Sequence, residues 1–305
     1  MEKDLAQQAG SFWDGKYVSG RAEGRLIRDW LECDYVRREY INRSMHGNPD
    51  WDWLTYLAES HLRPHALRAV LDVGCGEGSV SIALIGAGIA EKSIGVDVSA
   101  QGIEAAKGHA NAAGIGARAE FMCADILNLD FDGGFFDAIV INMALHHVLD
   151  IERLLAKIKR WKAPNAILAI HEYVGPNRFQ WTDAARFEGE RLLRSLPPKL
   201  RVHGISNEIV ESLWSPTYRD MLVGDPSEAI RSAEMIDILD CYFERIERRD
   251  FGGTILQPLL VDIVHNFEFE RDASHRSELD RLFAAERELL RSGRITSNFS
   301  FLAYR

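Results

Sequence analysis

A glycine-rich turn between two short strands is the feature that most constrains this chain. The largely apolar segment Val70–Val73 predicts a buried strand, and Gly74, Gly76 and Gly78 follow it at alternate positions, as a turn close to a ligand requires. A helix-compatible run comes next, and then a second strand that ends at Asp97. This order predicts the nucleotide-binding half of a doubly wound α/β sheet, with Asp97 accepting hydrogen bonds from ribose hydroxyls.

The charge of the turn indicates which nucleotide it binds. Dinucleotide sites hold a pyrophosphate at a helix N-terminus, where amide groups and the helix dipole favour negative charge. Here Asp72 precedes the turn and Glu77 lies inside it, and two carboxylates would repel a pyrophosphate. S-adenosylmethionine carries a sulfonium and an ammonium group and no phosphate, so it fits this charge. The sequence Leu71–Gly78 resembles the first motif of the class I S-adenosylmethionine-dependent methyltransferases.

The resemblance covers about residues 65 to 172 and implies roles for particular positions. The turn would hold the amino-acid end of the cofactor. The end of the second strand would bind the ribose and lie against adenine, and the end of the third would read the adenine amino group. Asn142, at the end of the fourth strand, matches the residue beside the transferred group. The implied cofactor-binding residues are Asp72, Gly74, Cys75, Gly76, Glu77, Asp97, Val98, Asp125, Ile126 and Asn142.

Three side chains are candidates for catalysis, namely Asn142, His146 and Tyr173. His146 could act as a general base, or its imidazole could have a structural role. No carboxylate stands at metal-ligand spacing beside His146 and His147, and we therefore predict no metal site. Tyr173 lies just past the fifth strand, where its ring could stabilise the sulfonium by a cation–π contact or its hydroxyl could orient an acceptor.

Strands and helices alternate through the middle of the chain and predict an α/β fold, a doubly wound, mostly parallel seven-stranded sheet of the class I methyltransferase type. Residues 1–66 precede this region and are rich in aromatic side chains, so we expect a helical extension that acts as a lid. We expect residues 67–305 to form the cofactor-binding domain, with helical cap insertions at about 175–225 and 252–296. The pattern of Ser227–Leu239 also favours a helix.

Composition narrows the choice of partners. The net charge of −10 argues against a nucleic-acid partner, which would require a basic face. The four cysteines show no Cys-x-x-Cys spacing, so they indicate neither a zinc site nor a disulfide framework. The first residues lack a secretory apolar core, and the longest apolar stretch is too short to span a bilayer. We expect a cytoplasmic protein with a small-molecule substrate and no membrane partner; its oligomeric state stays open.

These observations leave three hypotheses for function. The first is an S-adenosylmethionine-dependent methyltransferase that acts on a small molecule, as in secondary metabolism. The second keeps the cofactor but changes the bond: the methionine amine attacks the γ-carbon and yields azetidine-2-carboxylate and methylthioadenosine. The third is a cofactor-binding regulatory or scaffold protein without enzymatic activity. A closed pocket with aromatic walls would suit the cyclase, whereas methyl transfer needs room for a second substrate.

Overall fold

The computed structural model describes the backbone of residues 2–20, 28–63 and 65–305. Its centre is a seven-stranded sheet with the strand order β3-β2-β1-β4-β5-β7-β6. Strands β1 to β5 are parallel, and β7 runs antiparallel to both of its neighbours. The strands are β1 (Leu67–Val73), β2 (Ala90–Asp97), β3 (Ala119–Cys123), β4 (Phe136–Asn142), β5 (Lys162–Tyr173), β6 (Arg245–Gly252) and β7 (Phe299–Tyr304).

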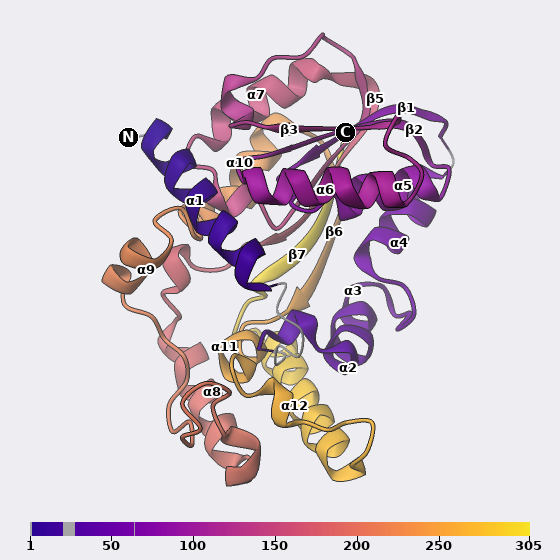
Figure 1. Ribbon diagram of the computed structural model, residues 1–305. Coiled ribbons are helices and arrows are strands. Elements are labelled where there is room, and N and C mark those ends of the chain that lie inside the picture. The colour runs from indigo at the N-terminus through magenta and orange to yellow at the C-terminus, as the bar shows by residue number, and fades with distance from the viewer. Residues whose placement is uncertain (1, 21–27, 64) are drawn as a thin grey trace.

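The strand order reverses beside β1. From β1 the chain builds outward through β2 and β3, and it then returns to place β4 and β5 on the other side (Figure 1). In open sheets of this kind a ligand binds at the carboxyl ends of the strands that flank the reversal. The register confirms that these ends are level, because Val73 of β1 pairs with both Val96 of β2 and Ile141 of β4.

Helices cover both faces of the sheet. One face packs against α4 (Trp53–Leu57), the wide turn η3 (Ala58–Leu62), α5 (Ser79–Gly86) and α6 (Ala100–Ala112). The other face packs against η4 (Ile126–Asn128), α7 (Ile151–Trp161) and α10 (Met235–Tyr242). Helix α7 follows from its amphipathic sequence, since the side chains at Ile151, Leu154, Leu155, Ile158 and Trp161 form one stripe and all are fully buried.

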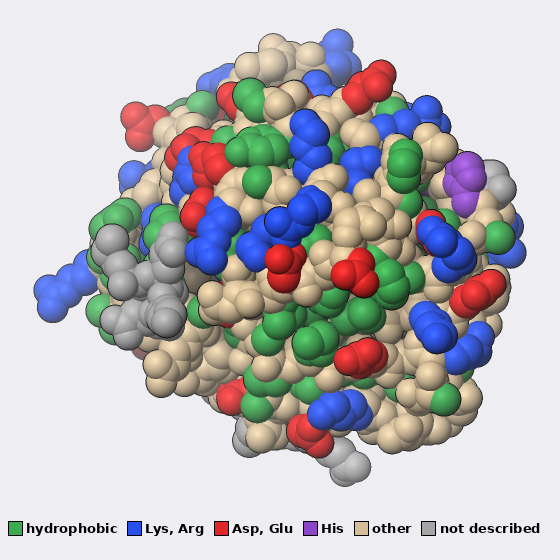
Figure 2. All heavy atoms as spheres, turned by 90° about the horizontal axis from the view of Figure 1, so that it is seen from above, with side chains coloured by type: hydrophobic (Ala, Val, Ile, Leu, Met, Phe, Trp, Pro, Cys, Tyr) green, Lys and Arg blue, Asp and Glu red, His purple; other side chains and the backbone are tan. Residues whose placement is uncertain are grey.

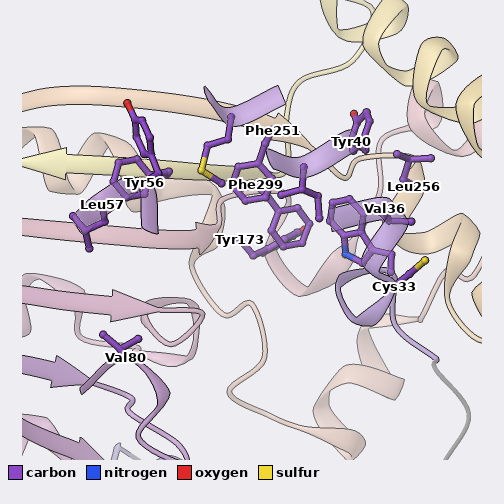
Figure 3. Packing of buried hydrophobic residues seen from close by; sticks show 14 of the residues in the cluster. Cys33, Val36, Tyr40, Tyr56, Leu57, Val80, Tyr173, Phe251, Leu256 and Phe299 are labelled. Atoms are coloured by element: carbon purple, nitrogen blue, oxygen red, sulfur yellow. The ribbon is translucent and has the colours of Figure 1, made fainter. Parts of the chain in front are cut away.

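The N-terminal part consists of short helices outside the sheet. They are α1 (Glu2–Gly20), η1 (Trp30–Glu32), α2 (Asp34–Val36), η2 (Arg37–Asn42) and α3 (Arg43–His46). Helix α1 contacts α6 (Figure 1). The segment from η1 onward anchors itself in the core through Trp30, Val36 and Tyr40 (Figure 3).

The C-terminal half inserts further helices between strands. Between β5 and α10 lie η6 (Asn177–Phe179), α8 (Asp183–Ser195), η7 (Pro198–Arg201), α9 (Tyr218–Gly224) and η8 (Ser232–Glu234). Between β6 and β7 lie α11 (Leu256–Leu260), η9 (Val264–Asn266) and α12 (Ala273–Arg291). Helices α8 and α11 contact each other, so the two insertions meet in space although about 60 residues separate them in the chain (Figure 1).

One expected helix differs from the structure. The prediction of a helix over Ser227–Leu239 is correct only from Met235, where α10 begins. The earlier residues follow a locked turn: the Ser227 backbone and hydroxyl both donate to Asp225 Oδ1, at 2.8 and 2.6 Å, and Ala229 has a positive φ of 48°. This side-chain bonding competes with the helical backbone pattern.

The surface and the cysteines agree with the composition. Figure 2 shows Lys and Arg side chains interspersed with Asp and Glu over the face that it presents. All four cysteines are free thiols. In the described part of the chain, no helix combines the length and the apolar character that a bilayer crossing demands.

Candidate active site

A cavity of about 350 Å³ lies at the carboxyl ends of β1, β2 and β4. The turn after β1 forms one wall, and the residues after β3 and β4 form others. Nine of the ten sequence-predicted cofactor residues line it: Gly74, Cys75, Gly76, Glu77, Asp97, Val98, Asp125, Ile126 and Asn142. The structure therefore brings together residues from four strand ends at one cavity.

The turn after β1 depends on glycine for both shape and space. Gly74 has a φ of +70°, and a Cβ atom there would lie 2.2 Å from the Cβ of Ala144. The backbone N–H groups of Gly74 and Cys75 donate to Val96 O, at 2.8 and 3.1 Å. The N–H of Gly76 donates to Asp97 Oδ2 at 2.9 Å. The second strand thus holds the turn in place.

The two predicted nucleoside-binding carboxylates are both fixed by backbone N–H groups. Asp97 Oδ1 accepts from Ser99 N at 2.8 Å, in addition to the bond from Gly76 to Oδ2. Burial raises the pKa of Asp97 against these stabilising bonds. Asp125 Oδ1 accepts from Leu127 N at 2.9 Å and begins the turn η4. Each carboxylate thus has a fixed orientation at the wall of the cavity.

Asp72 lies behind the turn and does not line the cavity. Its side chain is buried, and its Oδ2 accepts from the Ser81 hydroxyl at 2.8 Å and from Ser81 N at 3.2 Å. Burial raises the pKa of Asp72 to about 6. The direct role that Asp72 has in this structure is to fix the first turn of α5.

Tyr173 also lies away from the cavity. The sequence analysis expects its ring beside the sulfonium, but the structure places the ring edge-on to Phe179 and Phe299, with centroids 4.8 and 5.3 Å away (Figure 3). Its hydroxyl donates to Pro176 O at 2.9 Å. Tyr173 therefore packs in the aromatic core, where alternation along β5 also places His171.

His146 is held in a buried chain of charges at η5 (Leu145–His147). Its Nδ1 bonds Glu172, and its Nε2 lies 3.2 Å from Glu228 Oε1. Burial disfavours the imidazolium, but the two carboxylates outweigh this effect and raise the pKa of His146 to about 10. The pKa of Glu228 falls to about 2, because the bond and charge of His146 outweigh the opposing effect of burial. His146 does not line the cavity, and it ties the segment after α9 to η5.

His147 differs from its neighbour because it lines the cavity. Its Nδ1 lies 3.0 Å from Ser227 Oγ. Donor atoms of His146, His147 and Glu228 lie within 4.8 Å of one another, so these three residues could hold a metal ion among those the structure describes. The absence of a metal stays a prediction. Sequence reasoning missed this grouping because Glu228 lies about 80 residues beyond the histidines.

Helix α1 covers the cofactor cavity. Leu5, Ala6, Ala9 and Trp13 line its wall. The carboxylate of Asp14 accepts from the Ser99 hydroxyl at 2.6 Å and from Gln101 N at 2.9 Å, which joins α1 to the start of α6.

A second chamber, of about 430 Å³, adjoins the first. Residues 31–55 form most of its wall, and Asn142, Met143 and His171 close it toward the sheet. Asn142 and Met143 line both spaces, so they form the partition between them. Met143 has a positive φ of 50°, a strained conformation for this residue type. The sequence analysis did not identify Met143 or Trp53 as chamber residues, because residues 31–55 show no motif that places them here.

Comparison with known proteins agrees with this geometry. Residues 70–165 match the family model for a methyltransferase domain. Norajmaline N-methyltransferase of Rauvolfia serpentina is 25% identical over 63% of this chain and 63% of its own length. The chain therefore spans less than two thirds of this curated relative.

Solved structures show the same fold at low sequence identity. The [4+2]-cyclase SpnF covers 99% of this chain and 96% of its own, with a TM-score of 0.56 and 16% identity. Geranyl diphosphate methyltransferase in complex with S-adenosylmethionine covers 82% and 83%, with a TM-score of 0.50 and 14% identity.

Residues 70–165 are thus a methyltransferase domain of the class I S-adenosylmethionine-dependent family. The predictions of this class, of its mostly parallel seven-stranded sheet and of S-adenosylmethionine as its cofactor are confirmed. The predicted transferase class also agrees with these matches. Location in the cytoplasm stays a prediction.

Proposed function

We propose that this protein is an S-adenosylmethionine-dependent methyltransferase whose acceptor is a small molecule. The methyltransferase domain and the residues that line the first cavity support cofactor binding there. The names of the relatives support the substrate class, since norajmaline and geranyl diphosphate are both small molecules.

The observation that carries the proposal is the partition between the two chambers. Methyl transfer is an in-line displacement, so the acceptor must approach from the side opposite the sulfur. The cofactor supplies the electrophilic methyl group, and the protein aligns the reactants. Asn142 and Met143 face both spaces, so an acceptor in the second chamber would meet a cofactor in the first at this partition.

Helix α1 is proposed as the lid of the cofactor site. It contributes Ala9 and Trp13 to the wall, and Asp14 joins it to α6. A lid of this kind excludes water and completes the site after the cofactor binds. Residues 21–27, which also belong to the expected extension 1–66, lie outside the described residues.

The second chamber supports methyl transfer over the azetidine-forming cyclisation. Cyclisation consumes the cofactor alone and needs no space for an acceptor. The aromatic residue expected to stabilise its charge, Tyr173, packs away from the first cavity.

Product analysis tests the three hypotheses. Purified protein is incubated with S-adenosylmethionine alone and with a panel of small phenols, alcohols and amines. We expect S-adenosylhomocysteine only when an acceptor is present, and an Asp97→Ala control should form much less. Methylthioadenosine from cofactor alone, above the spontaneous rate, would reverse the choice in favour of the cyclase. Binding without any consumption would favour the regulatory protein.

A further inference from the structure

His171 is held rigidly between the two halves of the second chamber. Its ring stacks on Trp53 with centroids 4.9 Å apart and planes 8° apart, and on Phe251 at 5.1 Å and 6°. On the sheet it pairs with Asn142 of the neighbouring strand. The side chain lines the chamber although the residue is only 6% exposed. Packing on both faces therefore fixes the plane of the imidazole.

The partner of Nδ1 determines where the imidazole carries its proton. Nδ1 lies 2.9 Å from Asn142 Oδ1, an amide oxygen that can only accept a hydrogen bond. Nδ1 is therefore the protonated nitrogen of the neutral ring, and Nε2 has a free lone pair. Nε2 is buried and bonds no group in the part of the chain that the structure describes. A buried nitrogen of this kind requires a donor.

The charges near the ring keep it neutral. Burial lowers the pKa of His171 to about 4, and the opposing charges of Glu172 and Asp52 do not compensate. Near pH 7 the lone pair is thus available. A group that donates one hydrogen bond to Nε2 would satisfy it.

The chamber itself favours an uncharged ligand. Several walls are apolar, among them Ile41, Met45 and Met143. The charged residues on its lining are paired with each other: Arg37 with Asp34 at 3.0 Å and Arg38 with Asp50 at 2.6 Å. Asp52 accepts from Thr55 N at 2.7 Å and begins α4. The lining thus offers no unpaired cation to attract an anionic acceptor.

We propose that the second chamber binds an uncharged, hydroxyl-bearing molecule, a phenol or an alcohol, and that His171 Nε2 accepts its O–H hydrogen bond and then its proton. This inference rests on the proposed methyltransferase function and adds the acceptor class and the base. In the transfer step an oxygen lone pair forms the O–CH₃ bond. The C–S bonding pair stays on sulfur, which becomes the thioether of S-adenosylhomocysteine. The hydroxyl proton moves to Nε2 and leaves later to solvent.

A weak base is sufficient for this step. The hydroxyl proton becomes strongly acidic as the oxygen gains its methyl group, so proton transfer is favourable even to an imidazole with a depressed pKa. The imidazolium that forms keeps its Nδ1 bond to Asn142 and lies near the carboxylate of Asp52, which favours the charged ring. His171 thus differs from His146, whose two nitrogens are both engaged by carboxylates.

The experiment follows the His171 nitrogens by NMR in ¹⁵N-histidine-labelled full-length protein with S-adenosylhomocysteine bound. The probes are phenol and anisole, which share a ring but differ in the O–H donor. We expect the Nδ1–H tautomer of His171 from pH 5.5 to 8, and phenol should shift the Nε2 resonance toward that of a hydrogen-bonded nitrogen. Anisole should leave it unchanged.

Two variants serve as controls. His171→Phe keeps an aromatic ring between Trp53 and Phe251, assigns the resonance by its loss, and should weaken phenol binding at least tenfold. His65→Gln, at an exposed histidine, should change neither the His171 signals nor phenol binding.

The outcomes separate this inference from the proposed function. Calorimetry with S-adenosylhomocysteine reports on the cofactor site alone, and a wild-type protein that fails to bind it contradicts the methyltransferase proposal. With that binding intact, the inference is overturned if His171 is an imidazolium at pH 7, if Nε2 carries the proton, or if phenol and anisole act alike. A phenol-specific shift that His171→Phe abolishes supports it.

Discussion

Asp97 has two roles at the cofactor cavity, and both use the same carboxylate. Its oxygens accept from Gly76 N and Ser99 N, which fixes the glycine turn and the start of α6 relative to β2. Each carboxylate oxygen has a further lone pair that can accept from a ribose hydroxyl. Loss of the carboxylate would therefore affect both the ligand contact and the shape of the turn.

We expect Asp97→Ala to weaken binding of S-adenosylmethionine at least tenfold, because hydrogen bonds to a charged group contribute about 1.5–3 kcal/mol each. Asp97→Asn keeps the size and one acceptor oxygen and should give a smaller loss. Titration calorimetry measures both dissociation constants, and thermal melting verifies that the variants fold. An unchanged constant for Asp97→Ala would remove this residue from the site.

At the scale of elements, the position of α1 depends on a close contact at Gly10. A Cβ atom at Gly10 would lie 2.8 Å from the backbone oxygen of Val98, a residue of the cavity wall. Gly15, in the same helix, has nothing within 4 Å of the corresponding position. The pair therefore offers one substitution, glycine to alanine, with and without a clash.

We expect Gly10→Ala to move α1 away from the cavity and to speed release of the cofactor several-fold. Gly15→Ala should leave release unchanged and stabilise the helix by up to about 1 kcal/mol, the usual difference between these residues. Stopped-flow displacement of bound S-adenosylhomocysteine measures the release rates. Equal rates in the two variants would argue against α1 as a lid.

The insertion between β6 and β7 depends on a second buried carboxylate, Glu286 of α12. It accepts from the backbone N–H groups of Gly253, Ile255 and Leu256 and from the Tyr40 hydroxyl, and it is fully buried. One side chain thus joins α12, the turn before α11 and the N-terminal segment.

We expect Glu286→Ala to lower the free energy of unfolding by at least about 3 kcal/mol, because it leaves several buried donors unpaired at roughly 1–3 kcal/mol each. Glu288→Ala, on the same helix, removes an exposed carboxylate paired with Arg291 and should cost less than about 1 kcal/mol. Urea titration measures both values. Similar losses in the two variants would show that Glu286 is not the link between these elements.

For the whole molecule, local patterns predicted the sheet but not the contacts between distant segments. The glycine turn, Asp97 and the end of β4 carry their signal in short motifs, and nine of the predicted residues meet at one cavity. Glu228 reaches His146 from about 80 residues away, and Trp53 and Phe251 reach His171 from opposite ends of the chain. No spacing rule encodes such pairings.

Tyr173 shows the same limit within one strand. The sequence placed His171, Glu172 and Tyr173 at the acceptor side but could not rank them, since their environments come from other segments. The structure gives each a different partner: Asn142 for His171, His146 for Glu172 and Pro176 for Tyr173. Which side chain meets a ligand is thus decided by tertiary packing.

The buried pairing of His146 with Glu172 and Glu228 should make the stability of the whole molecule depend on pH. The pKa of His146 is raised from 6.5 to about 10 in the folded protein, so above pH 6.5 the folded chain retains a proton that the unfolded chain has lost. The stabilising effect is therefore complete below pH 6.5 and disappears as the pH rises to about 10. Breaking such a buried pair costs on the order of 3 kcal/mol or more.

We expect the wild-type melting temperature to fall between pH 6.5 and 10 by several degrees more than that of His146→Gln, which has no proton to lose. The variant should also be less stable at pH 6.5, because Gln leaves two buried carboxylates without their cation. His65→Gln, at an exposed position, should follow the wild-type curve, which separates His146 from other groups that titrate in this range. Parallel curves for the wild type and His146→Gln would show that the imidazole is not charged in the folded protein.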